Sequence, residues 1–298
     1  MKIFISISNN IDFNLALENW LFLHELKDEK IVFLWQNSPC VVIGRAQNPW
    51  LECNFKSMDE DRIHVARRQS GGGTVYHDYG NLNYTILSPK SKHNAKDNLD
   101  LICSIVKNIG IDIYPNERND IVTDYEGETY KVSGSAFREK RDRAFHHGTL
   151  LIHADTNKLY DYLHQPIDPS LDTKGVKSHR SKVLNLSSIQ PDIQTQDITR
   201  SFFTSLRSIE LSIIDENTPL ENKELIDSEI EKLKSWDWIF GKTLPFTKEY
   251  TNNSNKLIVK VNSGLVSEID YNGKIIDTSD KYIRFKQYYE FDDFTQYL

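Results

Sequence analysis

The sequence has few cysteines, no long apolar run and no excess of positive charge. Its three cysteines in 298 residues are an odd number and form no CxxC pair, which argues against a disulfide framework and a structural zinc site. Nowhere do 18 apolar residues follow one another, so no membrane-spanning helix is expected. A net charge of −7 disfavours a general nucleic-acid binder. We therefore expect a cytoplasmic protein that binds neither membranes nor nucleic acids.

The pattern of apolar residues predicts an α+β fold. Strands are expected at 31–43 (two, separated by a turn), 63–67, 74–77, 81–87, 119–123, 128–138 and 145–153, and helices at 12–26, 98–109 and 195–208. Many strands with few helices indicate helices that cover a mixed sheet.

A second unit is expected to begin near residue 221. Residues 221–234 form a charged helix pattern, and strands follow at 257–261 and 265–271. Asn272-Gly273 is the strongest short hairpin signal in the chain. The sequence therefore predicts a large domain at 1–220 and a small α+β accessory domain at 221–298.

Three consecutive glycines, Gly71–Gly73, follow Arg67 and Arg68. Without Cβ atoms this backbone can approach a ligand closely and point its N–H groups at anionic oxygens. A triple glycine alone is more often a flexible turn, but the arginines and the polar cluster at 77–81 favour a ligand site. Two familiar nucleotide motifs are incomplete, because 236–243 lacks the first glycine of a P-loop and 71–76 lacks the third glycine of the dinucleotide fingerprint.

Lys131 stands in a run of small residues that ends at Ala136. Alternation along a strand would place it on one face with Ser133, Ser135 and Phe137. Alone, such a lysine reads as a solvent-facing side chain. A cation that faces an anion-binding glycine loop, however, is what an enzyme needs to make an acyl-adenylate. Lys131 is therefore the candidate catalytic residue.

Two motifs leave alternatives open: the histidines His77, His146 and His147, and the dipeptide Asn119-Asp120. His146 and His147 are neighbours that a strand would point to opposite faces, and the chain has no HExxH motif, so a shared zinc ion is not expected. We expect one of these two histidines to face the pocket and the other to pack. Asn119-Asp120 is either structural or places a carboxylate for Mg²⁺.

These motifs, in this order, resemble the lipoate–protein ligase A family. The resemblance runs through 42–54, 67–83, 118–120, 131–138, 145–151 and 174–186. It implies a catalytic domain of the biotin/lipoate ligase type, followed by an accessory domain that is shorter than the usual version.

The resemblance implies an enzyme that uses ATP and Mg²⁺ to activate lipoate to lipoyl-AMP and transfers the lipoyl group to a lysine. The implied acceptors are apo lipoyl domains of 2-oxoacid dehydrogenase acyltransferase subunits and the glycine cleavage H protein, and the implied state is a monomer. A transferase that uses preformed lipoyl-AMP or lipoyl-protein stays open as an alternative, favoured by the short C-terminal unit. A non-catalytic lipoate carrier is disfavoured by Lys131 and the glycine loop.

The resemblance also implies roles for individual residues. Those implied for ATP and the adenylate are Arg68, Gly73, Thr74, Val75, Tyr76, Asn119, Asp120 and Lys131, with Asp120 as the candidate Mg²⁺ ligand. Those implied for lipoate are Trp35, Ser70, Gly71, Gly72, His77, Lys131 and His147. A loop that carries Lys174, Ser178 and Arg180 is implied to close over the adenylate. Because the whole segment 164–182 is long, we expect it to be mobile without ligand.

Overall fold

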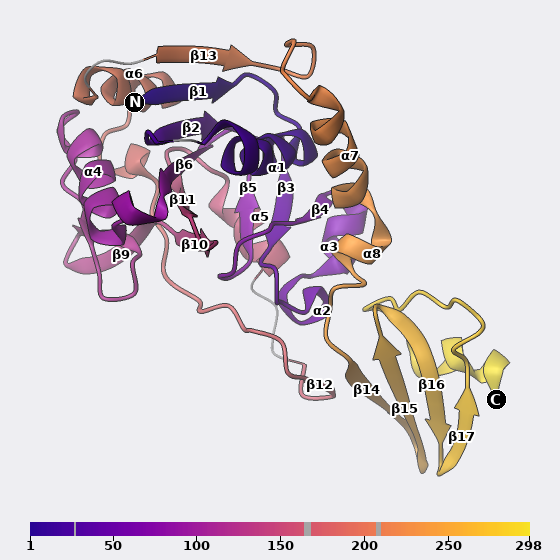
Figure 1. Ribbon diagram of the computed structural model, residues 1–298. Coiled ribbons are helices and arrows are strands. Elements are labelled where there is room, and N and C mark those ends of the chain that lie inside the picture. The colour runs from indigo at the N-terminus through magenta and orange to yellow at the C-terminus, as the bar shows by residue number, and fades with distance from the viewer. Residues whose placement is uncertain (27, 164–167, 207–209) are drawn as a thin grey trace.

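The computed structural model describes residues 1–26, 28–163, 168–206 and 210–298. Its centre is a six-stranded mixed sheet (Figure 1). In spatial order the strands are β10 (Ser135–Glu139), β11 (Arg143–Leu151), β6 (Asn81–Pro89), β2 (Ile31–Trp35), β1 (Lys2–Ser6) and β13 (Glu210–Ile214). Strand β1 runs parallel to β2 and β13, whereas β6 runs antiparallel to β2 and β11. The predicted α+β class with a mixed sheet is confirmed.

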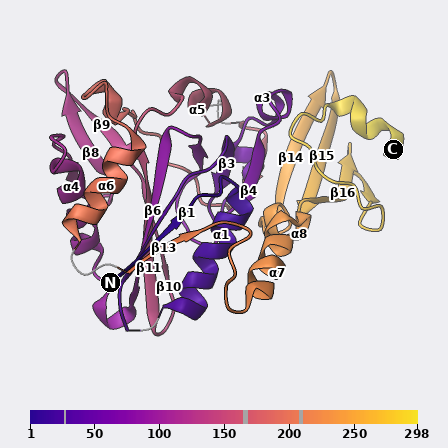
Figure 2. The same ribbon diagram turned by 90° about the horizontal axis from the view of Figure 1, so that it is seen from above.

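Helices cover both faces of this sheet (Figure 2). One face carries α1 (Ile11–Trp20), which continues as a π-helix over Leu21–Glu25, and α7 (Lys223–Lys234); the other carries α4 (Ala95–Lys107) and α6 (Thr195–Ser205). Strand β2 shows the consequence, because Phe33 joins the core under α1 while Val32 and Leu34 join the core under α4. A strand covered on both faces needs apolar residues throughout, which explains the uninterrupted sequence Ile-Val-Phe-Leu-Trp.

Two small sheets flank the central one. The first consists of β4 (His64–Arg67), β3 (Cys40–Ile43) and β5 (Val75–His77), and the second of β7 (Tyr114–Pro115), β8 (Ile121–Tyr125) and β9 (Glu128–Ser133). The glycine loop connects β4 to β5. Further helices are α2 (Pro49–Glu52), α3 (Phe55–Glu60), α5 (Thr156–Leu163) and α8 (Trp236–Ile239), with 3₁₀ turns at Lys90–Lys92, Leu186–Ser188 and Phe291–Tyr297. None of the helices in the described ranges is long and apolar enough to cross a bilayer.

The single strand predicted at 128–138 is wrong. The chain divides at Gly134 into β9 and β10, which belong to different sheets. Gly134, between the two strands, is held by Thr149, whose backbone N donates to Gly134 O at 3.1 Å. The predicted common face is therefore interrupted, because Lys131 and Ser133 lie on β9 whereas Ser135 and Phe137 lie on β10.

The C-terminal region contributes to two cores. Helix α7 packs against α1, and α8 packs against α7 and β4. Their Ile226, Leu233 and Trp238 join the core that contains α1. A five-stranded sheet has a core of its own, and its strands in order are β12 (Leu171–Thr173), β14 (Phe246–Asn252), β15 (Asn255–Asn262), β16 (Leu265–Tyr271) and β17 (Lys274–Asp277). Asn272-Gly273 forms the turn between β16 and β17 with φ of 51° and 87°. The division of domains at 220/221 stays a prediction; from this packing we propose a boundary nearer residue 240.

Candidate active site

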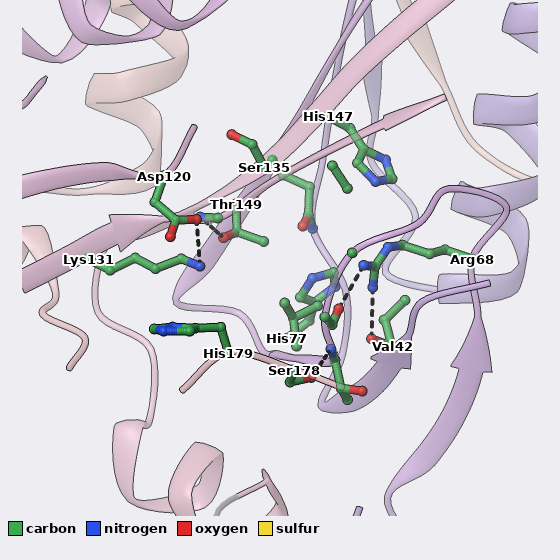
Figure 3. A pocket seen from close by; sticks show the side chains of 18 of the residues that line it. Val42, Arg68, His77, Asp120, Lys131, Ser135, His147, Thr149, Ser178 and His179 are labelled. Atoms are coloured by element: carbon green, nitrogen blue, oxygen red, sulfur yellow. Dashed lines mark hydrogen bonds and ion pairs between the residues drawn. The ribbon is translucent and has the colours of Figure 1, made fainter. Parts of the chain in front are cut away.

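Two adjoining cavities, of about 320 and 170 Å³, lie between the glycine loop and Lys131. Figure 3 shows residues that line the first cavity. Residues from the glycine loop, β9, β11 and the segment 177–179 line both of them. The shared residues are Thr74, Val75, Lys131, Gly134, Thr149, Lys177, Ser178 and His179. The first cavity extends to Trp35 and His147, and the second extends to Tyr76 and Arg180. Together they form one elongated candidate site.

Lys131 is held in this site from two directions. Its Nζ lies 2.8 Å from Asp120 Oδ1. Its backbone pairs with residues 182–184: Lys131 N donates to Lys182 O, and Lys131 O accepts from Leu184 N. A Cβ on Gly134 would lie 3.1 Å from Lys131 Cε, so glycine leaves the room that the lysine side chain uses. An anionic ligand in the cavity would compete with Asp120 for the ammonium group.

Arg68 holds the glycine loop in shape. Its Nη2 donates to Gly71 O at 2.6 Å and to Gly73 O at 2.7 Å, and its Nη1 donates to Val42 O. Gly72 has φ of +87°, and a Cβ there would lie 2.9 Å from Arg68 Nη2. Burial lowers the pKa of Arg68 to about 10, which leaves it charged at neutral pH. The implied contact of Arg68 with phosphate would require it to exchange these carbonyls for phosphate oxygens.

The neighbouring Arg67 has a structural role that the sequence did not reveal. It is fully buried and donates to the carbonyls of Gly44, Arg45 and Gln47 and to Ile239 O. Desolvation lowers its pKa to about 10. Arg67 therefore joins the turn at 44–47 to the start of the C-terminal unit. In the sequence it looks the same as Arg68.

His147 belongs to a buried chain of hydrogen bonds. Its Nδ1 donates to Glu18 Oε1 at 2.8 Å, and its Nε2 lies 2.8 Å from Ser70 Oγ. The Thr85 hydroxyl also donates to Glu18. Burial opposes ionisation of Glu18, but His147, Thr85 and Arg138 outweigh it and lower the pKa of the carboxyl. This chain of bonds thus fixes the Ser70 side chain. Neither Ser70 nor Gly71 lines either cavity.

The other two histidines differ in environment. His77 lines the first cavity, and the Asn37 amide donates to its Nδ1 at 2.9 Å. Burial, with Arg68 nearby, lowers the pKa of His77 to about 3, so it is neutral. His146 instead stacks on Phe137 with ring centroids 4.5 Å apart and lines neither cavity. Of the adjacent pair, His147 faces the cavity and His146 packs.

The segment after β12 lies over the glycine loop. Thr74 N donates to Ser178 Oγ at 2.9 Å, and Val176 N donates to Ala46 O. Arg180 lines the second cavity, whereas Lys174 is exposed and lines neither. Residues 164–167 of the predicted loop fall outside the described residues.

Of the implied ATP residues, Asn119 lies outside both cavities. It is exposed, with φ of +63° in a turn, whereas Arg118 and Asp120 on either side line the first cavity. The remaining implied residues of the first cavity are Trp35, Arg68, Gly72, Gly73, Thr74, Val75, His77, Lys131, His147 and Ser178.

Comparisons with known proteins identify the family of this chain. Residues 10–207 match the family model of the lipoyl protein ligase A/B catalytic domain. Over 251 residues the chain is 40% identical to lipoate-protein ligase A of Bdellovibrio bacteriovorus, covering 83% of this chain and 74% of that protein. It is similar to P. falciparum LipL1 in complex with lipoate, with a TM-score of 0.70 and 31% identity over 91% of this chain and 84% of that chain. A lipoate-protein ligase A bound with ATP shares the fold, with a TM-score of 0.63 and 20% identity over 80% of this chain and 97% of that chain. The chain therefore belongs to the lipoyl protein ligase A/B catalytic-domain family and is an enzyme of the lipoate–protein ligase type.

Proposed function

We propose that this protein activates lipoate with ATP to give lipoyl-AMP and then transfers the lipoyl group to a lysine of an acceptor protein. The observation that carries the proposal is the position of Lys131, which faces the glycine loop across a cavity. The lipoate carboxylate and the triphosphate are both anionic, so the barrier to their reaction is largely electrostatic. A cation in a site shielded from water offsets this repulsion.

The two cavities suit the two parts of the adenylate. Apolar side chains, among them Leu15, Trp35 and Val42, line the first cavity and match the hydrocarbon part of lipoate. Its carboxylate would then lie at Lys131, where the cavities meet. The second cavity, beside Tyr76 and Arg180, would take the nucleotide.

Asp120 fits the role of a single carboxylate ligand for Mg²⁺. Magnesium is commonly bound through one or two carboxylates together with substrate phosphates. The described residues contain no group of three or more potential metal ligands, so a site built from protein side chains alone is not proposed. When bound, Mg²⁺ would neutralise charge on the pyrophosphate. Asp120 would have to turn from Lys131 to hold it.

The proposed acceptors are apo lipoyl domains of 2-oxoacid dehydrogenase acyltransferase subunits and the glycine cleavage H protein, which family membership supports. We place the reaction in the cytoplasm, because an odd number of cysteines suits a reducing compartment. We further propose that the enzyme acts as a monomer.

A transferase that uses preformed lipoyl-AMP is the second candidate. Arg68 is bonded to loop carbonyls and Asp120 is paired with Lys131, so both side chains expected to contact the triphosphate are engaged with the protein. An enzyme that never handles a triphosphate could keep them so.

Exchange of labelled pyrophosphate into ATP separates the two candidates. The ligase should catalyse this exchange only when lipoate is present, because pyrophosphate is released when the adenylate forms. The absence of exchange, together with transfer from added lipoyl-AMP, would replace the ligase proposal with the transferase.

A further inference from the structure

The buried side chain of Gln47 joins three segments of the active site. Its Oε1 accepts from Gly44 N at 2.8 Å and from Thr74 Oγ1 at 2.9 Å, and its Nε2 donates to Ser178 Oγ at 2.9 Å. Because a backbone N–H can only donate, the bond from Gly44 identifies the amide oxygen and fixes the orientation of the amide. Gln47 Nε2 therefore points at Ser178. With 1% of its surface exposed, Gln47 is too deeply buried to be a solvent-facing contact.

The hydroxyl of Ser178 has its accepting capacity filled. A serine hydroxyl has two acceptor sites and one hydrogen to donate. Gln47 Nε2 and Thr74 N both donate to Ser178 Oγ, each at 2.9 Å. No hydrogen bond donated by this hydroxyl is present among the described residues. The remaining hydrogen is therefore available to a ligand.

The position of Ser178 indicates which part of a ligand would receive this hydrogen. Ser178 lines both cavities, and Figure 3 shows it between Arg68 and Lys131. A Cβ on Gly73 would lie 3.0 Å from Ser178 Oγ, so the hydroxyl rests directly on the glycine loop. An acyl-adenylate that spans the two cavities would have its phosphate at this junction. Hydrogen bonds to ionised acceptors are stronger than those between neutral groups.

We propose that Gln47 is a positioning residue: it orients the Ser178 hydroxyl so that the hydroxyl donates to a phosphate oxygen of the acyl-adenylate and retains that intermediate. The inference rests on the proposed function only in naming lipoyl-AMP as the ligand. A second bond supports the same placement, because Ser178 N donates to Glu52 Oε1 at 3.1 Å. The backbone of Ser178 is thus anchored by Glu52, and its hydroxyl is oriented by Gln47.

The dissociation rate of added lipoyl-AMP tests the proposal with the full-length protein. Ser178→Ala removes the donor. Gln47→Glu keeps the size of the side chain and an oxygen for Gly44 N, but it replaces the amide nitrogen by an acceptor that attracts the serine hydrogen. Each single variant should release lipoyl-AMP about tenfold faster, as expected for the loss of one hydrogen bond to a charged group. The double variant should release it no faster than Ser178→Ala, because the two residues act through one bond.

Thr173→Val is the matched control. The Thr173 hydroxyl accepts from Asn48 Nδ2 at 3.1 Å and from Gly175 N at 3.3 Å, so it also joins the turn after β3 to the segment after β12, but outside both cavities. This variant should leave the dissociation rate within about twofold of the wild type, since no bond to the ligand is lost.

Three results would overturn the proposal: an unchanged rate in Ser178→Ala, additive effects of Gln47→Glu and Ser178→Ala, or an equal acceleration by Thr173→Val. Thermal unfolding of each variant checks that the fold is kept. Because lipoyl-AMP is supplied, this assay tests the role of Gln47 even if the protein cannot make lipoyl-AMP from ATP. Such a failure would contradict only the proposed ligase function.

Discussion

His146 offers a test of how burial controls the protonation of this protein. The side chain is fully buried between Phe137 and Tyr84, and neither ring nitrogen has a hydrogen-bond partner among the described residues. Burial, followed by the nearby His147, lowers the pKa of His146 from 6.5 to about 3. Replacing it by phenylalanine should keep the stacking and remove the buried polar group.

The expected magnitude follows from proton linkage. In the unfolded chain this histidine binds a proton below a pH of about 6.5, whereas in the folded protein it stays neutral down to a pH of about 3. The unfolded state therefore binds more protons in this window, and stability falls as the pH falls. Between pH 7.5 and pH 5.0 the loss is about 2 kcal/mol for His146. His77, whose pKa is also about 3, causes a similar loss of stability in wild type and in His146→Phe, so it cancels in the comparison.

Urea unfolding at pH 7.5 and pH 5.0 measures the effect. The stability of His146→Phe relative to wild type should improve by about 2 kcal/mol on going to pH 5.0. His146→Asn should reduce the pH dependence equally but be less stable than His146→Phe at both pH values, because it keeps an unpartnered polar group and loses the stacking on Phe137. An equal pH dependence in wild type and His146→Phe would refute the assignment of His146 as a buried neutral residue.

Three further predictions concern the site. Lys131→Ala should lower the rate of adenylate formation at least about a hundredfold, and Lys131→Arg should not restore it, because the space beside Gly134 fits the lysine. Single-turnover formation of lipoyl-AMP measures both rates. A near-normal rate in the Ala variant would contradict the assignment of Lys131. Gly72→Val should abolish binding of lipoate and ATP without unfolding the protein, since φ of +87° and the nearby Arg68 Nη2 exclude a side chain. Unchanged affinities in calorimetry would indicate that this loop is only a flexible turn. Proteolysis within 168–182 should slow when lipoate, ATP and Mg²⁺ are added, and equal cutting with and without ligands would argue against a closing segment.

The sequence predicted the parts of this protein that depend on local pattern. Strand β2 and helix α4 follow from apolar periodicity, and the turn between β16 and β17 follows from Asn272-Gly273. Lys131 is a candidate in the sequence only together with the glycine loop, because a cation that faces an anion-binding loop suits adenylate chemistry. The structure brings Lys131 and this loop to one cavity.

What the sequence did not predict depends on contacts between distant residues. The division into β9 and β10 at Gly134 was not predicted, because the sequence on both sides of this glycine reads as one continuous strand. Glu18 lies on α1, far along the chain from His147, so their hydrogen bond has no local signal. Likewise, Gln47 was part of a recognised motif, but its bond to Ser178 across 131 positions could be identified only from the fold.

The most direct test of the central claim is the modification of an apo lipoyl domain by the purified protein. With free lipoate, ATP and Mg²⁺, we predict a lipoylated lysine on the acceptor and release of one pyrophosphate for each group transferred. Lys131→Ala should give neither product. If the lipoylated acceptor forms only from added lipoyl-AMP, and no pyrophosphate appears with ATP, the claim that this protein activates lipoate is contradicted.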